Sequence, residues 1–203
     1  MIDESDLVEI FERVRSLPYD TLAAHDAAGL LVDGRGNCVA TAGLLSEELS
    51  ALGARCRAVS WEYELPVLVD AQQHLAFRSD IHTTVQVRVE GRWVLADATH
   101  DPRLGILGLT IGRWDGHHDT EPAYRAVGPC VVHGQDGPGS TQLKGAMERI
   151  GRQVEATDPD LIAQYQRDLN ELFEGCRSTI DGRATKPYPA ERPDPRPSGA
   201  LTR

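Results

Sequence analysis

Apolar residues recur at intervals of three and four along two stretches of the N-terminal half, a spacing that places them on one face of a helix. The first stretch predicts a helix over residues 3–17, which Pro18 ends. The second predicts a helix over residues 37–52, stopped by Gly53 and opened by Cys38. The apolar positions are Leu7, Ile10, Phe11, Val14 and Leu17 in the first helix, and Cys38, Ala42, Leu45, Leu49 and Leu52 in the second.

Three later stretches are rich in β-branched and aromatic residues and predict strands. They read ARCRAVSW over residues 54–61, DIHTTVQVRV over 80–89 and RWVLADA over 92–98. Only Glu90 and Gly91 separate the last two, which is typical of a tight hairpin. Helices followed by an antiparallel sheet indicate the α+β fold class.

The remaining chain divides into a glycine-rich segment, two helical patterns and a proline-rich end. The glycines of residues 99–140 predict surface loops with short extended pieces, a place where substrate contacts are common. Apolar spacing predicts a C-terminal helical pair over residues 141–176, with a cap and a first-turn proline at Asp158 and Pro159. Residues 177–203 resemble a disordered, proline-rich tail. We therefore expect one domain over residues 1–176.

Charge and composition limit the classes of binding partner that we expect. The chain has 31 acidic and 21 basic residues and a formal charge of -10, so we expect no binding to nucleic acid or to an anionic membrane surface. No charged-then-apolar leader or long apolar run is present, and we expect a cytoplasmic protein. The four cysteines have neither zinc nor redox spacing. We expect free thiols and neither a metal nor a cofactor.

Cys38 stands where two glycines and an asparagine meet the second predicted helix. A cysteine is a nucleophile as the thiolate, which the positive end of a helix and a neighbouring imidazolium both stabilise. Gly34 and Gly36 leave room for a substrate carbonyl, so that the Cys38 amide could donate to an oxyanion. The alternative is a buried core thiol, since cysteine is among the most buried residue types.

His82 is the best candidate for the base that acts on Cys38. If two residues connect the hairpin, opposite positions have numbers that sum to 181, and Thr84 faces Asp97. His82 and Asp97 are then diagonal neighbours on one face, with Cα atoms roughly 7–8 Å apart. The carboxylate would orient the imidazole and stabilise its charged form. A three-residue connection would place the two side chains on opposite faces.

Four residues are further candidates for binding the substrate or completing an oxyanion site: Asn37, Tyr19, Trp61 and Thr84. The tyrosine and the tryptophan join a large apolar surface to one hydrogen-bond donor, although packing in the core is the alternative for both. His74 is an alternative base, but it has neither a strand pattern nor a carboxylate in register.

The segment DGHHDT over residues 115–120 holds residue types that ligate metals. Adjacent histidines point apart, however, and no second ligand pair has a matching spacing. We therefore expect a solvated loop at this segment and no metal site.

Together these motifs resemble the transglutaminase-like superfamily, a papain-like group with a cysteine at a helix start, a histidine on a strand and an aspartate on the next strand. The matching text is GRGNCVATAGLLSEELSALGARCRAV and DIHTTVQVRVEGRWVLADATHDP, within a core motif over residues 34–102. The resemblance implies a nucleophile helix packed on an antiparallel sheet, with Cys38 as nucleophile, His82 as general base and acid, and Asp97 as the orienting residue. Members often carry an alanine and an aromatic after the histidine, where this chain has Thr83 and Thr84.

The sequence therefore predicts cysteine-dependent acyl transfer through a thioester acyl-enzyme. With water as acceptor the reaction is hydrolysis of a peptide or amide bond, which we expect first. With an amine as acceptor the enzyme is an amide-forming acyltransferase in small-molecule biosynthesis, whose acyl-thioester substrate a carrier protein could present. A further alternative is a domain that binds a peptide or a protein without catalysis.

Overall fold

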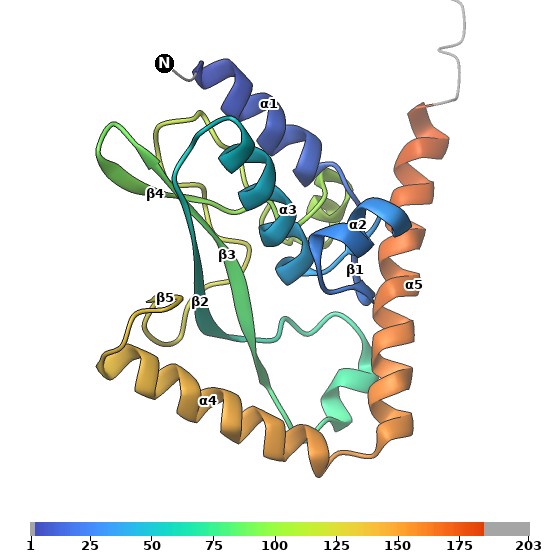
Figure 1. Cartoon of the computed structure of the whole chain (residues 1–203). Coiled ribbons are helices and arrows are strands. Elements are labelled where there is room, and N and C mark those ends of the chain that lie inside the picture. Colours follow the sequence, from blue (N-terminus) through green and yellow to red (C-terminus); the bar gives the residue numbers. More distant parts are fainter. Residues whose placement is uncertain (1–2, 185–203) are drawn as a thin grey trace, which may run out of the picture.

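The computed structural model describes residues 3–184 of the chain. Five helices, five strands and two 3-10 segments alternate along this part (Figure 1). The helices are α1 (Glu4–Arg15), α2 (Ala27–Asp33), α3 (Cys38–Ala51), α4 (Pro138–Glu155) and α5 (Pro159–Ala184). The strands are β1 (Tyr19–Ala24), β2 (Cys56–Glu64), β3 (Ser79–Val89), β4 (Arg92–Ala96) and β5 (Val131–Val132), and the 3-10 segments are Asp70–His74 and Pro102–Leu107. The α+β fold class is confirmed.

The sheet has four antiparallel strands in the order β4-β3-β2-β5. The turn between β3 and β4 consists of Glu90 and Gly91, whose φ angles of 49° and 82° are those of a two-residue hairpin turn. Val89 pairs with Arg92 and Val85 with Ala96, so opposite numbers sum to 181 as predicted. This register places His82 and Asp97 on one face of the sheet.

The first helix and α3 cover one end of the sheet and bury the main core. Asp3 caps α1 by accepting a hydrogen bond from the Ser5 amide, and the apolar face predicted from sequence is buried through Leu7, Phe11 and Val14. The inward face of α3 packs against the same core, together with the valines of β3. As a result, the N-terminus of α3 is held at a fixed place beside the sheet.

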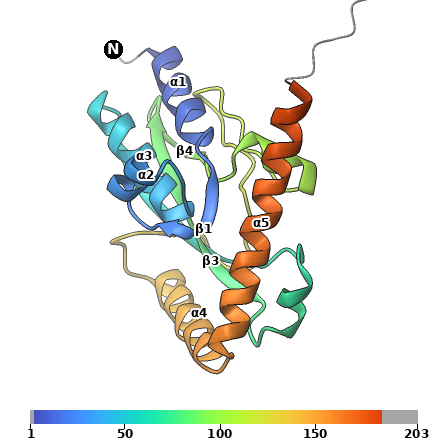
Figure 2. The same ribbon diagram turned by 90° about the vertical axis from the view of Figure 1, so that its right-hand side faces the viewer.

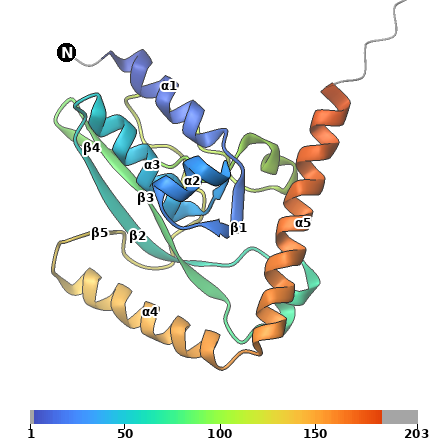
Figure 3. The same ribbon diagram turned by 45° about the vertical axis from the view of Figure 1, so that its right-hand side comes forward.

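The two C-terminal helices exist as predicted but do not pack along each other as a pair. They diverge from the short connection between them (Figures 2 and 3). Helix α4 lies against β2, β3 and β5, whereas α5 packs against β1 and both 3-10 segments. Each helix therefore closes a different side of the space next to α3.

Other boundaries differ from the sequence prediction. Strand β1 and helix α2 were not predicted, and α5 continues to Ala184, beyond the expected domain end at residue 176. The segment over residues 99–140 is not only surface loop, because Leu104, Trp114 and Ala123 are buried in it. The predicted tail beyond residue 184 lies outside the described residues. Among the described residues, no helix is long and apolar enough to cross a membrane.

Candidate active site

Cys38 is the first residue of α3, as the sequence predicts. The side-chain oxygen of Asn37 accepts hydrogen bonds from the amides of Val39 and Ala40 at 3.0 and 3.1 Å, which caps the helix. The amide nitrogen of Asn37 contacts the His25 ring, so both polar atoms of its side chain already have partners within the protein. Within residues 3–184 the Cys38 amide makes no hydrogen bond, as expected for a first-turn N–H, and remains able to donate to a ligand.

His82 and Asp97 form a fully buried pair. The Nε2 atom of His82 lies 2.8 Å from Oδ2 of Asp97, and both side chains have no exposed surface. The carboxylate also accepts hydrogen bonds from the amides of Ala123 at 2.8 Å and Thr99 at 3.2 Å. These bonds fix the carboxylate, which in turn fixes the orientation of the imidazole.

The other nitrogen of the imidazole is free and faces the thiol. His82 Nδ1 is buried and has no hydrogen-bond partner of good geometry in the described part of the chain. Cys38 is half-buried and lies beside this ring. Burial lowers the pKa of His82, but the Asp97 carboxylate and the Cys38 sulfur outweigh it and raise the pKa to about 10.

The pKa of the partner carboxylate moves in the opposite direction. Burial raises the pKa of Asp97, whereas the His82 imidazolium and the amide hydrogen bonds lower it, with a net value of about 2. Both directions favour a charged pair near neutral pH.

Aromatic rings surround the imidazole of His82. The ring centroids of Trp61, Tyr124 and Tyr63 lie 4.8, 5.2 and 6.2 Å from it, and Trp61 is its direct neighbour across β2 and β3. The indole N–H of Trp61 donates to the Tyr124 carbonyl at 2.9 Å. Trp61 therefore holds His82 in place and does not line the cavity described below. Thr84 is buried as well and donates to the Ala96 carbonyl at 3.3 Å, so neither residue is placed to touch a substrate.

A second buried histidine orients two tyrosine hydroxyls. His100 Nδ1 lies 2.9 Å from the Thr110 carbonyl and must donate to it, so Nε2 accepts from the Tyr124 hydroxyl, also at 2.9 Å. Burial lowers the pKa of His100 to about 4, and the ring is neutral at pH 7. With the Tyr124 proton directed to His100, the Tyr124 oxygen can only accept at its 3.4 Å contact with the Tyr19 hydroxyl, so the Tyr19 proton points either to Tyr124 or into the cavity.

Cys38 opens into a cavity of about 350 Å³. The polar side chains that line it include Tyr19, Asn37, Tyr63 and Tyr124. Apolar walls come from the loop after β2, from α4 and from α5, including Leu65, Phe77, Ile150, Val154, Leu169 and Phe173. The cavity thus joins the thiol to the C-terminal helices, which the sequence did not place near it.

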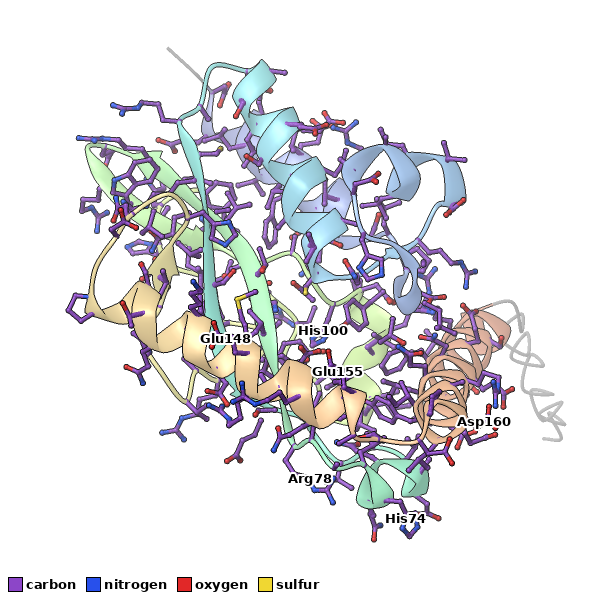
Figure 4. The ribbon with its side chains drawn as sticks, turned by 60° about the horizontal axis from the view of Figure 1, so that its bottom comes forward. His74, Arg78, His100, Glu148, Glu155 and Asp160 are labelled. Atoms are coloured by element: carbon purple, nitrogen blue, oxygen red, sulfur yellow. The ribbon has the colours of Figure 1, made fainter. Side chains whose placement is uncertain are left out.

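The alternative candidates lie elsewhere. His74 is exposed at the surface on the 3-10 segment and lines no part of the cavity (Figure 4). His117 pairs with Glu4 at 2.7 Å and His118 with Asp115 at 2.7 Å, so the adjacent histidines use separate partners. Within residues 3–184, no group of three or more potential ligands is arranged to hold a metal.

Sequence reasoning missed Tyr124, His100 and Asp80 as site residues. Tyr124 and His100 follow β4 in irregular segments, and only the folded chain brings them to His82. Asp80 had a usable signal, because it stands two residues before His82 on β3 and so shares its face.

Two comparisons with known proteins give a match, one to a family model and one to a solved structure. Residues 3–98, which include the cysteine, the histidine and the aspartate, match the family model of the transglutaminase-like superfamily. The chain is also similar to the solved structure of "a Putative Cysteine Protease" from Cytophaga hutchinsonii, with 18% identity and a TM-score of 0.37. That alignment covers 66% of this chain and 46% of the other, so the chain spans less than half the length of that protein. No curated protein matches the sequence. Over residues 3–98, just under half of its length, the chain is thus similar to the transglutaminase-like superfamily.

Proposed function

We propose that the protein is a cysteine hydrolase that cleaves an amide or peptide bond through a thioester on Cys38. The observation that carries the proposal is the buried His82–Asp97 pair, whose free Nδ1 faces a thiol at the start of a helix and at the wall of a cavity. A structural histidine would have both ring nitrogens satisfied, because a buried unpaired nitrogen costs free energy.

The first half-reaction starts from His82 as the imidazolium, because its pKa is raised to about 10, and from Cys38 as the thiolate whose proton Nδ1 has accepted. The thiolate attacks the substrate carbonyl carbon, and the carbonyl oxygen becomes an oxyanion that the Cys38 amide and the Tyr19 hydroxyl stabilise. The imidazolium then protonates the leaving amine, the C–N bond breaks, and a thioester remains on Cys38. Asp97 keeps its negative charge throughout and stabilises the imidazolium.

The second half-reaction transfers the acyl group to water. His82 accepts the proton of the attacking water, the C–S bond breaks, and the acid product leaves the Cys38 thiolate beside the His82 imidazolium, as at the start. An amine entering in place of water would give an amide, and the apolar walls around the thiol favour such an acceptor because they limit hydration. Amide formation is therefore the second candidate function.

The test is the rate of iodoacetamide alkylation of each cysteine between pH 4 and 9, followed by peptide mass spectrometry. We expect Cys38 to react fast below pH 7 in the wild type and to lose that advantage in His82→Ala, because the imidazolium stabilises the thiolate. The exposed Cys130 is an internal control, and His74→Ala removes a surface histidine as the matched variant. A Cys38 that reacts only near pH 8.5, or that is indifferent to His82, would leave a non-catalytic binding domain as the better explanation.

Product analysis separates the two candidate functions once a substrate panel of amides and thioesters gives turnover. Hydrolysis releases the free acid. If an added primary amine captures most of the acyl group at millimolar concentration, amide formation replaces hydrolysis as the assigned reaction.

A further inference from the structure

The lining of the cavity beside Cys38 includes a single carboxylate and one histidine, His25. Among the described residues that line it, Asp80 is the only aspartate or glutamate, and no lysine or arginine is present. Its neighbours are mainly aliphatic and aromatic side chains. A carboxylate in such surroundings loses part of its hydration, and the loss costs free energy unless a cation compensates the charge.

Asp80 forms no ion pair with a lysine or arginine of the described chain, and the cation that acts on its pKa is the His82 imidazolium, which is itself paired with Asp97. The Oδ1 atom of Asp80 accepts only the neighbouring Ile81 amide, at 2.8 Å. Arg78, two residues earlier, instead donates to backbone carbonyls of the loop before β3, among them Gln73 at 2.8 Å and Phe77 at 3.0 Å. Figure 4 shows Arg78 beside that loop, near His74. Asp80 is exposed to solvent, yet the residues around it desolvate the carboxylate enough to raise its pKa, although the Ile81 amide and the His82 charge lower it.

Two tyrosines lie near this carboxylate in the same cavity. Tyr63 lies directly opposite Asp80 in the pairing of β2 with β3, and Tyr165 of α5 lines the same cavity. Both are near enough for the Asp80 charge to contribute to raising their pKa values, although burial contributes most. A carboxylate near aromatic rings is a favourable site for an ammonium or guanidinium group, because the negative charge attracts a cation and a ring face can attract it as well.

The position of Asp80 relates this cation site to the reacting thiol. Asp80 and His82 are two residues apart on β3, so their side chains leave the same face with Cα atoms roughly 6–7 Å apart. Because Asp80 and Cys38 line the same cavity, a group held at Asp80 and a carbonyl at Cys38 can belong to one substrate.

We propose that the substrate, whether acyl donor or acyl acceptor, combines an apolar portion with one cationic group, an ammonium or a guanidinium, which Asp80 binds near Tyr63 and Tyr165. This inference rests on the proposed reaction at Cys38 and names its substrate class. The apolar portion occupies the space between α4 and α5, and the cation fixes which carbonyl or amine stands at the thiol.

The test compares thiol reagents that differ only in charge. Cys38 is modified at pH 8 with 2-(trimethylammonium)ethyl, 2-hydroxyethyl and 2-sulfonatoethyl methanethiosulfonate, and each rate is divided by the rate for a free small thiol. We expect the normalised rate to be about tenfold higher for the cationic than for the neutral reagent, since one charge acts over a few ångströms in a partly desolvated site. Asp80→Asn should abolish this preference, whereas Asp80→Glu should retain most of it.

Controls separate the cavity charge from the net charge of the protein. Glu64→Gln removes one negative charge from the exposed end of β2, outside the cavity, and should leave the preference unchanged. The ratio at the exposed Cys130 should stay the same in every variant. The same comparison of a cationic with a neutral group can be made in turnover with two substrates of similar shape, the aminomethylcoumarin amides of lysine and of norleucine.

Two outcomes would overturn the inference: no preference for the cationic reagent in the wild type, or a preference that survives in a folded Asp80→Asn variant. Neither affects the proposed reaction, which the His82 dependence of the rate with the neutral reagent reports separately.

Discussion

Asp97→Asn replaces the carboxylate of the buried pair by a group of the same shape. Every neighbour of the carboxylate is a donor: His82 and Ala123 donate to Oδ2 and Thr99 donates to Oδ1. An asparagine has one oxygen and one NH₂ group, so at least one of these donors would face another donor. The substitution therefore removes a charge and also leaves a buried hydrogen bond unmade.

The directions of the two pKa shifts determine how the stabilisation of the fold by the His82–Asp97 pair depends on pH. Because the pKa of His82 is raised from 6.5 to about 10, the pair stabilises the fold fully below pH 6.5 and loses that contribution as the pH rises toward 10. Because the pKa of Asp97 is lowered from 3.8 to about 2, the contribution is also lost as the pH falls through that range. The pair is thus strongest between pH 4 and 6.5.

The two shifts give different magnitudes for one interaction. At about 1.4 kcal/mol per pH unit, the His82 shift corresponds to about 5 kcal/mol and the Asp97 shift to about 2 kcal/mol. The His82 value also contains the effect of Cys38, so the pair itself is closer to the smaller figure. Adding the unmade hydrogen bond, we expect Asp97→Asn to cost about 3 kcal/mol at pH 6 and about 1 kcal/mol at pH 9.

Urea unfolding at pH 6, 7.5 and 9 measures this difference directly. Asp136→Asn, at an exposed aspartate, is the matched control and should change stability by less than about 0.5 kcal/mol at each pH. A destabilisation by Asp97→Asn that is the same at pH 6 and pH 9 would refute the charged pair, because only an ion pair gives the predicted slope.

Two further predictions concern residues that support the pair and the cavity, and urea unfolding measures both. A Cβ atom on Gly112 would lie 2.1 Å from the Asp97 carbonyl oxygen, so Gly112→Ala should lower the free energy of unfolding by about 3 kcal/mol. Gly145→Ala, in open space on α4, should instead raise the free energy of unfolding by about 0.5–1 kcal/mol. Arg177→Met leaves the buried Asp101 unpaired and should cost about 3–5 kcal/mol, whereas Arg35→Met, at a partly exposed ion pair, should cost less than about 1 kcal/mol. Equal costs for the two members of either comparison would contradict the packing described here.

The central part of the site was predictable because its determinants are local. A two-residue turn at Glu90 and Gly91 fixes the register of a hairpin, and the register alone brings His82 to Asp97. The start of α3 was predictable for the same reason, since a capping asparagine and an apolar stripe lie within a few residues of Cys38.

Residues that reach the site through tertiary packing gave weak or misleading signals. Trp61 and Thr84 looked like substrate contacts, yet the sheet buries both beneath the cavity. The end of α5 is polar, so its sequence resembled a tail. It is held by a buried ion pair, and charged residues do not produce the helical repeat of apolar positions by which a buried helix is recognised. Arg177, the first residue of that predicted tail, is only 6% exposed.

That arginine connects the C-terminal helix to the candidate oxyanion donor. Its Nη2 atom donates to the Tyr19 carbonyl at 2.7 Å and to Asp101 at 2.6 Å, and the same carboxylate accepts the Tyr19 amide at 3.2 Å. Both backbone groups of Tyr19 are therefore held by residues outside the segment that matches the family. The groups proposed to carry out acyl transfer lie within residues 3–98, while α4 and α5 supply cavity walls and fix the tyrosine beside the thiol. We infer that the family segment determines the chemistry and that the C-terminal helices determine which acyl groups reach it.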